Sequence, residues 1–406
     1  MQFLRTKYLE KLNKWKDEHF IKVITGVRYC GKTSILNQFI QQLKDEGTFN
    51  EQIQQYDFNI LDADKYGWEK LKKLIIKNSI ASKTNYIFLD EIQEVKNFEK
   101  CVIALFEDKT IKFDIYVTGS NSTMFSSSMA TKFTGRHIEI KVFPLSFSEF
   151  YKCVKTIDST KEKMEIFWNY VKYGGLPIIL NFLDSEEKTK IALAKVLQDC
   201  IETDIYKRHN IKTENFLKIS NYMFLQIAQP FSATNVQNFL KSNNSDDIDY
   251  KTIMRYIGWL MEANLLYECE FALTKTKDVL KTNAKYYSVD TGLRNSASRW
   301  TNINRGYQIE NIVFLELLRN GYEVNVGRLW DNREIDFIAS KNDETLYIQV
   351  TEKIDWDKET PNYKREIGNL ESIRNSHPKI VLSVYDETTV LNSGVKVINL
   401  FEWLMK

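Results

Sequence analysis

The sequence predicts an α/β protein that begins with a parallel sheet covered by helices on both faces. Short β-branched or aromatic runs alternate with amphipathic stretches over residues 21–143, and a glycine-bearing turn directly follows the first run. The strand rhythm then stops at Pro144. Strands that alternate with helices need crossover connections, which place helices on both faces of a parallel sheet.

The expected strands of this first part can be read directly from the apolar runs. They are IKVIT, QQYDFNI, YIFLDE, FDIYVTGS and HIEIKVF. SILNQFIQQLKDEG has apolar residues at helical spacing and ends at Gly47, a residue type that commonly terminates helices. NFEKCVIALFED has the same helical spacing. The first strand, the turn and the first helix therefore follow one another without a break.

The composition indicates a folded protein of several domains without a global charge signal. The 406 residues exceed what one compact core usually holds. The 56 basic and 54 acidic residues give a formal net charge of +2, so any nucleic-acid surface must be a local patch. The five cysteines are scattered and form no CxxC pair, and no run of about 18 apolar residues or signal peptide occurs. We expect a cytoplasmic protein with no membrane association.

We divide the chain into four parts. Residues 1–145 form the first α/β domain, and residues 146–210 form a helical lid because their apolar positions have helical spacing throughout. Residues 211–300 contain three expected helices followed by two strands, the order of a winged helix-turn-helix. Residues 301–406 begin with the helical stretch YQIENIVFLELLRNG and then alternate strands with a helix, which predicts a second α/β domain.

The turn after the first strand, GVRYCGKT, matches the phosphate-binding loop pattern GxxxxGK[ST]. Glycines at these spacings let backbone N–H groups turn toward phosphate oxygens at the positive end of a helix. Lys32 is then expected to contact the β- and γ-phosphates of ATP, and Thr33 to ligate Mg²⁺. The predicted nucleotide-binding residues are Gly26, Val27, Arg28, Tyr29, Cys30, Gly31, Lys32, Thr33 and Ser34.

An acidic pair follows four apolar residues in YIFLDE, so it emerges at the carboxyl end of a strand, where ligands bind in such sheets. Asp90 is predicted to hold Mg²⁺, directly or through water, and Glu91 to orient and deprotonate the attacking water as the general base. A strand that merely ends in acidic residues would look the same. The preceding phosphate-binding loop favours the functional interpretation.

Four further residues are candidates near the same site. FDIYVTGSNS should lie beside the first strand, so Ser120 or Asn121 can contact the γ-phosphate or its water, although turn residues that cap a strand look alike. Arg136 is a candidate to stabilise transition-state charge in its own or a neighbouring subunit, and a solvated arginine is the alternative. GGLPIIL resembles the GxP element of STAND NTPases, which implies an adenine contact for Pro177; a plain helix-start proline is equally consistent.

The order of motifs along the whole chain resembles a family of prokaryotic AAA-type ATPases with a C-terminal PD-(D/E)xK nuclease-like domain of unknown function. The resemblance rests on GVRYCGKT, FLDEIQ, VTGSNS, FTGR, PLSFSEF, GGLP, KYYSVDTGLRN, IENIVFLELLRNGYEV, EIDFI and YIQV. It implies an AAA-like P-loop NTPase sheet with a helical lid, a winged helix-turn-helix and a restriction-endonuclease-like α/β end. The family pattern GVRRxGKT is replaced at Tyr29 and Cys30, neither of whose side chains is needed for backbone contacts to phosphate.

The resemblance also implies a candidate second metal site at Glu310, Asp336 and Gln349. The nuclease pattern needs a lysine beside the nucleophile, but Thr351 stands at that position and Lys353 comes two residues later, about 7 Å along an extended strand. We therefore expect a degenerate nuclease fold that binds DNA or protein rather than an active nuclease.

These features favour a Mg²⁺-dependent ATPase whose nucleotide state controls a DNA- or protein-binding C-terminal half. Lys251, Thr252 and Arg255 lie at the solvent side of the expected recognition helix, whereas nearby aspartates oppose phosphate binding. One alternative is a STAND-like nucleotide switch that recruits a protein partner. Another is a metal-dependent nuclease in defence or repair. The partner and the oligomeric state stay open.

Overall fold

The computed structural model describes residues 3–58, 61, 63–120, 133, 135–211, 213–242, 248–274, 279–301 and 303–406. The chain divides into two compact units, residues 1–143 with 262–264, and residues 144–261 with 265–406. Asn121, a predicted site residue, lies outside the described residues. Among the described helices, none is both long and apolar enough to cross a bilayer.

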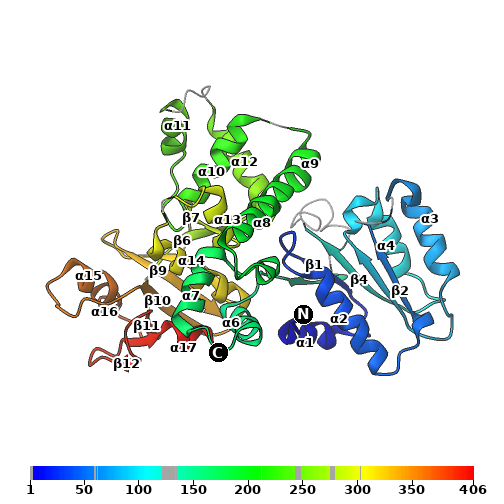
Figure 1. The fold of residues 1–406 in the computed structure, drawn as a ribbon, viewed down its shortest axis with the longest axis horizontal. Coiled ribbons are helices and arrows are strands. Elements are labelled where there is room, and N and C mark those ends of the chain that lie inside the picture. Colours follow the sequence, from blue (N-terminus) through cyan, green and yellow to red (C-terminus); the bar gives the residue numbers. More distant parts are fainter. Residues whose placement is uncertain are drawn as a thin grey trace. The chain divides into compact units, whose positions relative to one another are not determined.

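The first unit contains a five-stranded parallel sheet in the order β2-β3-β4-β1-β5 within its described residues (Figure 1). The predicted parallel sheet is confirmed, and every predicted strand is present. Their bounds are β1 Ile21–Thr25, β2 Ile53–Asp57, β3 Asn85–Asp90, β4 Phe113–Gly119 and β5 His137–Lys141. As predicted, β4 lies directly beside the strand that leads into the phosphate-binding loop.

Helices cover both faces of this sheet because alternate strand residues point to opposite sides. Ile87 and Val117 pack on one face in a core shared with α3 (Ala63–Lys77) and α4 (Phe98–Phe106). On the other face, Phe88 and Tyr116 stack on each other and contact Phe39. Phe39 belongs to α2 (Lys32–Asp45), which contacts α1 (Thr6–Trp15). The short 3-10 helices are η1 Asn50–Gln52 and η2 Ile92–Glu94.

The second unit starts with helices, as predicted from the helical spacing. They are α6 Phe147–Ile157, α7 Lys163–Tyr173, η4 Pro177–Asn181, α8 Glu186–Asp199, the π-helical segment η5 Cys200–Tyr206 and α9 Lys207–His209. Within the predicted helical lid, the stretch LPIILNFL has helical spacing but forms only the 3-10 helix η4. The next helices are α10 Glu214–Leu225, α11 Ala233–Ser242 and α12 Tyr250–Glu262.

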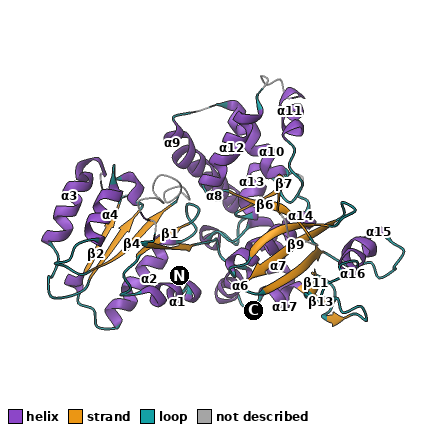
Figure 2. Ribbon diagram, turned by 180° about the vertical axis from the view of Figure 1, so that it is seen from behind, coloured by secondary structure: helices purple, strands orange, loops and turns teal. Residues whose placement is uncertain are grey.

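An eight-stranded mixed sheet completes the second unit in its described residues, in the order β12-β13-β11-β10-β9-β8-β6-β7 (Figure 2). The strands are β6 Leu266–Leu273, β7 Val279–Ser288, β8 Glu323–Arg328, β9 Glu334–Lys341, β10 Glu344–Thr351, β11 Lys379–Ser383, β12 Thr389–Val390 and β13 Lys396–Asn399. The predicted ribbon of β6 and β7 is antiparallel, but β6 also pairs with β8. The ribbon therefore belongs to the same sheet as the C-terminal strands and does not form a separate wing.

Helices flank this sheet and supply part of the candidate site. They are α13 Thr291–Ala297, α14 Arg305–Arg319, α15 Pro361–Tyr363, η6 Lys364–Gly368, α16 Asn369–Glu371 and α17 Leu400–Leu404. Ile367 and Leu370 pack in a core with residues of β9 to β11. Phe314 of α14 stacks on Tyr287 of β7. The helix α14 is thereby fixed against the strands that carry the polar residues described below.

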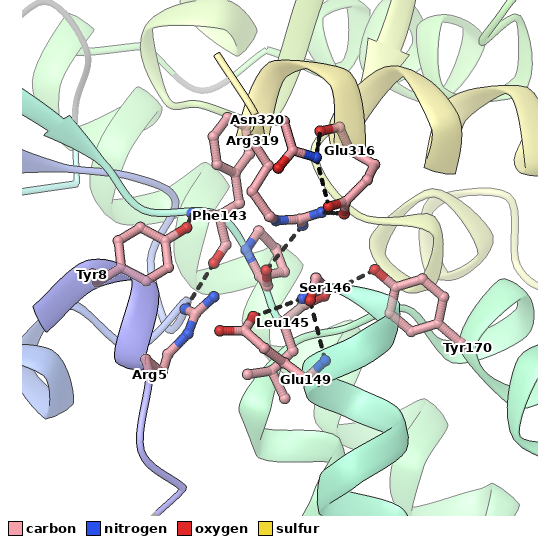
Figure 3. Close-up of polar contacts among 11 residues, drawn as sticks. Arg5, Tyr8, Phe143, Leu145, Ser146, Glu149, Tyr170, Glu316, Arg319 and Asn320 are labelled. Atoms are coloured by element: carbon pink, nitrogen blue, oxygen red, sulfur yellow. Dashed lines mark hydrogen bonds and ion pairs between the residues drawn. The ribbon is translucent and has the colours of Figure 1, made fainter. Parts of the chain in front are cut away.

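The chain leaves the first unit at Phe143, and each side of this crossing is fastened within its own unit (Figure 3). Phe143 donates its N–H to Tyr8 Oη at 3.0 Å and accepts at its carbonyl from Arg5 Nη1 at 2.9 Å. The Pro144 carbonyl accepts from Arg319 Nη2 at 3.2 Å. Ser146 and Glu149 form a capping box at the start of α6. The connecting backbone is thus anchored by side chains from distant parts of the sequence.

Candidate functional site

The phosphate-binding loop runs from β1 into α2 and needs glycine at two places. Gly26 has φ 149°, and a Cβ there would lie 2.2 Å from the Val142 carbonyl oxygen. Gly31 has φ 102° and caps the N-terminus of α2. The first-turn N–H groups of α2 therefore begin directly at the loop, at the positive end of the helix dipole. This is the backbone arrangement that binds a phosphate.

The side chains of the loop differ in exposure. Val27 and Cys30 are buried, and burial raises the pKa of the Cys30 thiol. Tyr29 is exposed, with φ 65°, and Ser34 is exposed at the start of α2. Cys30 also offers its carbonyl to Arg5 Nη1 at 3.1 Å, so a buried arginine supports the loop from beneath. Arg5 was not predicted as part of this site.

Lys32 is buried beneath the loop and lies close to the predicted general base. Its Nζ is 3.4 Å from Glu91 Oε1 and donates to the Gly26 carbonyl at 3.1 Å. Burial alone would raise the pKa of Glu91, but the Lys32 charge and a hydrogen bond from Gln93 outweigh it and lower the pKa. The predicted base is therefore ionised and able to accept a proton from water. The structure thus brings Lys32 and Glu91 together.

Asp90 ends β3 with its carboxylate fully buried. Its Oδ1 accepts from the Thr118 hydroxyl, and the Thr33 side chain also acts to lower the pKa of this carboxylate. Its Oδ2 is buried without a hydrogen-bond partner among the described atoms, and burial raises the pKa of Asp90. A buried carboxylate oxygen without a partner, next to a threonine hydroxyl, fits the hard oxygen ligands that Mg²⁺ prefers. The structure places Thr33 and Asp90 near each other, and their role as Mg²⁺ ligands stays a prediction.

Ser120 and Arg136 lie at different ends of the sheet of the first unit. Ser120 is buried at the carboxyl end of β4, and its carbonyl accepts from Asn264 Nδ2 at 2.9 Å. Arg136 precedes β5, whose first residue, His137, pairs with Ile21 at the start of β1. The strand β1 is about 13 Å long at 3.3 Å per residue. Arg136 therefore lies near the amino ends of the strands, whereas the phosphate-binding loop lies at their carboxyl ends.

This position argues against Arg136 acting on the nucleotide of its own subunit. Its Nη2 is 3.0 Å from Glu107 Oε1, and both side chains are substantially exposed. The part of the prediction that placed Arg136 beside the nucleotide of its own subunit is corrected because the parallel register puts the start of β5 away from the loop. Its action on a neighbouring subunit stays a prediction.

Pro177 belongs to the second unit and occupies the first position of η4. The preceding glycine turn is bound by Asp290, whose Oδ2 accepts from the Gly175 N–H at 2.7 Å. A Cβ at Gly174 would lie 2.0 Å from Asp290 Oδ1, so this position accommodates only glycine. The GGLP segment therefore has a structural role in the second unit, and its adenine contact stays a prediction.

The candidate second metal residues line one cavity of about 1250 Å³ in the second unit. Glu310 comes from α14, Asp336 from β9 and Gln349 from β10, and Asp336 N–H donates to Gln349 Oε1 at 3.3 Å. Burial and the nearby Glu310 raise the pKa of Asp336 well above its usual value. The structure thus gathers all three residues, although the described part of the chain holds no group of three or more His, Cys, Asp or Glu side chains able to bind a metal.

Two residues of this cavity region escaped prediction. Lys285 of β7 is buried and lies 3.3 Å from Glu310 Oε1 and 3.2 Å from Glu334 Oε2. Burial would lower the pKa of Lys285, but the facing carboxylates of Glu310, Asp336 and Glu334 raise it. Glu366 is fully buried beside Gln349, and one of its oxygens lacks a partner in the described structure. Lys285 and Glu366 are separated in sequence from Glu310, Asp336 and Gln349, and no local sequence pattern indicates that they belong to this site.

Comparisons with known proteins agree with this geometry. A family model described as an AAA domain matches residues 18–151, and one described as a domain of unknown function, DUF8612, matches residues 164–304. The second model covers the predicted lid from residue 164 onward and all of the predicted winged helix. The Walker-type ATPase PABY2304 of Pyrococcus abyssi has a similar structure, with a TM-score of 0.50 at 13% identity over 73% of this chain and 95% of that one.

The fold and the phosphate-binding loop therefore define an α/β P-loop protein with an AAA domain. An uncharacterized protein of Haemophilus influenzae is 36% identical over 99% of this chain and 98% of its own length. The uncharacterized protein MJ1544 of Methanocaldococcus jannaschii is 32% identical over 89% of this chain and 81% of its own length. This chain belongs to the same family as these relatives.

Proposed function

We propose that the protein binds ATP with Mg²⁺ and hydrolyses it to ADP and phosphate. The observation that carries the proposal is the buried group formed by Lys32, Asp90 and Glu91 beneath a glycine-lined loop at a helix N-terminus. Lys32 and the loop amides bind the phosphates, and Thr33 with Asp90 would hold Mg²⁺. The ion, when bound, offsets charge on the phosphate oxygens.

Glu91 is the proposed general base of the reaction. A water oxygen attacks the γ-phosphorus while the bond from that phosphorus to the β,γ-bridging oxygen breaks. Glu91 accepts the proton of the water and later releases it to solvent, and the lowered pKa keeps the carboxylate ionised for this step. Nucleotide must first draw Lys32 away from Glu91, because the two side chains face each other in this structure.

Two substitutions separate binding from chemistry. Lys32→Ala removes the phosphate contact, so we expect calorimetry to detect no ATP binding at concentrations that saturate the parent. Glu91→Gln keeps the shape but cannot accept a proton, so kcat should fall about 100-fold or more while ATP binding is retained. Gln55→Ala is a matched control on an exposed position of β2. Parent-like turnover by Glu91→Gln would exclude Glu91 as the base.

The role that we propose for the second unit is less specific. We infer that it binds DNA or protein and that nucleotide state controls this binding, in line with its large polar cavity. ATP turnover measured with and without duplex DNA tests the first partner, since DNA-stimulated turnover supports it. Nucleotide-dependent oligomerisation without stimulation by DNA would instead favour a switch that recruits protein.

Nuclease activity is the less favoured alternative because Lys285 already occupies the centre of the acidic group. Plasmid incubated with the protein and Mg²⁺ or Mn²⁺ should stay uncleaved. Cleavage that disappears in Asp336→Ala would establish the nuclease instead.

A further inference from the structure

Gln93 lies two residues after the proposed base, in the single turn η2 that follows β3. Its Nε2 donates to Glu91 Oε2. An ionised carboxylate can only accept hydrogen bonds, so the amide must direct its nitrogen toward Glu91 and its oxygen elsewhere. The chemistry of the pair thus fixes which end of the amide faces the base.

The two carboxylate oxygens of Glu91 have different partners. Oε1 faces Lys32 Nζ at 3.4 Å, whereas Oε2 accepts from Gln93. When Lys32 turns to the phosphates of a bound nucleotide, Oε1 loses its partner and becomes available to water. Gln93 retains Oε2 throughout, so the carboxylate is still held by one hydrogen bond during the reaction.

The backbone of Glu91 gives a reason why such a restraint is needed. Glu91 has φ 49°, in the left-handed region that non-glycine residues seldom adopt. Its N–H donates to Thr118 Oγ1 at 2.9 Å, and its carbonyl accepts from the Glu94 N–H at 3.2 Å. These bonds fix the main chain but leave the side chain to be positioned by Lys32 and Gln93.

The other end of the amide is also unusual. Gln93 Oε1 is buried and has no hydrogen-bond partner among the described atoms. A buried carbonyl oxygen without a partner is costly, so such groups commonly meet water or a ligand. Among the described atoms, the hydrogen bond to Glu91 is therefore the contact that orients this amide.

We propose that Gln93 is the positioning residue that keeps Glu91 aimed at the attacking water after Lys32 has moved to the phosphates. This inference rests on the proposed ATPase function. It assigns Gln93 no proton transfer: the water proton still goes to Glu91, and the broken bond is still that between the γ-phosphorus and the bridging oxygen.

The test compares Gln93→Met, which preserves length without a polar group, with the parent and with Gln55→Ala. We expect kcat of Gln93→Met to fall about 10- to 100-fold, as small displacements of a reacting group commonly cause. The Kd for a non-hydrolysable ATP analogue, measured by fluorescence titration, should stay within twofold. A kcat within twofold of the parent, or an equal loss of analogue binding, would overturn the assignment.

A double-substitution cycle separates positioning from a general structural effect. In a Glu91→Gln background the base is absent, so adding Gln93→Met should reduce the residual rate less than twofold. A structural role would instead lower the rate by the same factor in both backgrounds, and that result would overturn the inference. If the parent itself shows no ATP turnover, the proposed function fails rather than the role of Gln93 within it.

Discussion

Lys32 and Lys285 are both buried and face carboxylates, yet their surroundings differ in kind. Lys32 is 3.4 Å from Glu91 and also donates to the Gly26 carbonyl. Lys285 lies between Glu310 and Glu334, at 3.3 and 3.2 Å, with Asp336 adding further negative potential. Glu91 faces the first lysine at 3.4 Å, whereas two carboxylates face the second lysine at nearly the same distance.

The difference predicts how readily each site can bind a charged ligand, a triphosphate at Lys32 or a metal ion at Glu310 and Asp336. A triphosphate can replace Glu91 as the partner of Lys32 because several charged phosphate oxygens attract the lysine more strongly than one carboxylate at 3.4 Å. Lys285 already supplies the positive charge that a bound metal would bring to Glu310 and Asp336. A buried ion pair is strongly destabilised when one partner is lost, so this arrangement is costly to open. We interpret the first site as one where phosphate can replace Glu91 beside the lysine. In the second site, Lys285 already compensates the charge of the carboxylates.

The largest expected effect is that of Lys285→Met. The substitution removes the cation beside Glu310 and Asp336 and leaves Glu334 with the more distant Arg328, at 4.0 Å. The free energy of unfolding should therefore fall by about 3–5 kcal/mol in urea denaturation. The exposed Lys358→Met serves as control and should change it by less than about 0.5 kcal/mol.

Divalent ions sharpen this prediction. Mn²⁺ should raise the melting temperature of Lys285→Met more than that of the parent, because the ion can replace the lost charge. Equal stabilisation of both proteins would show that Lys285 does not fill the place of a cation, and the contrast drawn between the two sites would be wrong.

Asp290 extends the comparison to a buried carboxylate that backbone N–H groups compensate. Burial raises its pKa to about 6, above the ordinary 3.8. The folded state therefore binds the proton more tightly than the unfolded state, so this stabilisation is complete below about pH 3.8 and is lost as pH rises through 6. The side chain of Asp290→Asn cannot titrate. The loss in free energy of unfolding that this substitution causes should therefore be larger at pH 4 than at pH 7, by on the order of 3 kcal/mol.

Urea denaturation of both proteins at several pH values measures this deficit, with the exposed Asp184→Asn as control. A deficit for Asp290→Asn that is independent of pH would mean that Asp290 stays ionised in the fold and that its backbone donors fully offset burial.

Arg136→Ala should have the smallest effect. Its ion pair with Glu107 is exposed, and such pairs contribute about 0–1 kcal/mol. Turnover should stay within twofold of the parent in dilute protein, because the arginine lies away from the phosphate-binding loop of its own unit. A tenfold loss that appears only at concentrations where the protein self-associates would instead establish action on a neighbouring subunit.

The candidate nucleotide site was predictable because its residues are close in sequence or follow buried strands. The strand IKVIT, the loop ending at Thr33 and the pair Asp90 and Glu91 all appear where the patterns place them. Arg136 was misplaced with respect to its own nucleotide because a motif shows the next strand but not which end of the sheet it starts from. Gln93 is part of the motif FLDEIQ, but the motif does not show where its side chain points. Only the turn at Glu91 in the structure shows that the Gln93 amide faces the base.

The sequence alone determined the parallel sheet, its phosphate-binding loop and the acidic strand end, because hydrophobic periodicity and glycine spacing act over a few neighbouring residues. Only the tertiary structure decided that β6 joins the C-terminal sheet, that Asp290 binds the GGLP turn and that Lys285 meets Glu310. Those contacts join residues that are distant in sequence. They depend on strand register and on the requirement that buried charges and N–H groups find partners, which no local pattern records.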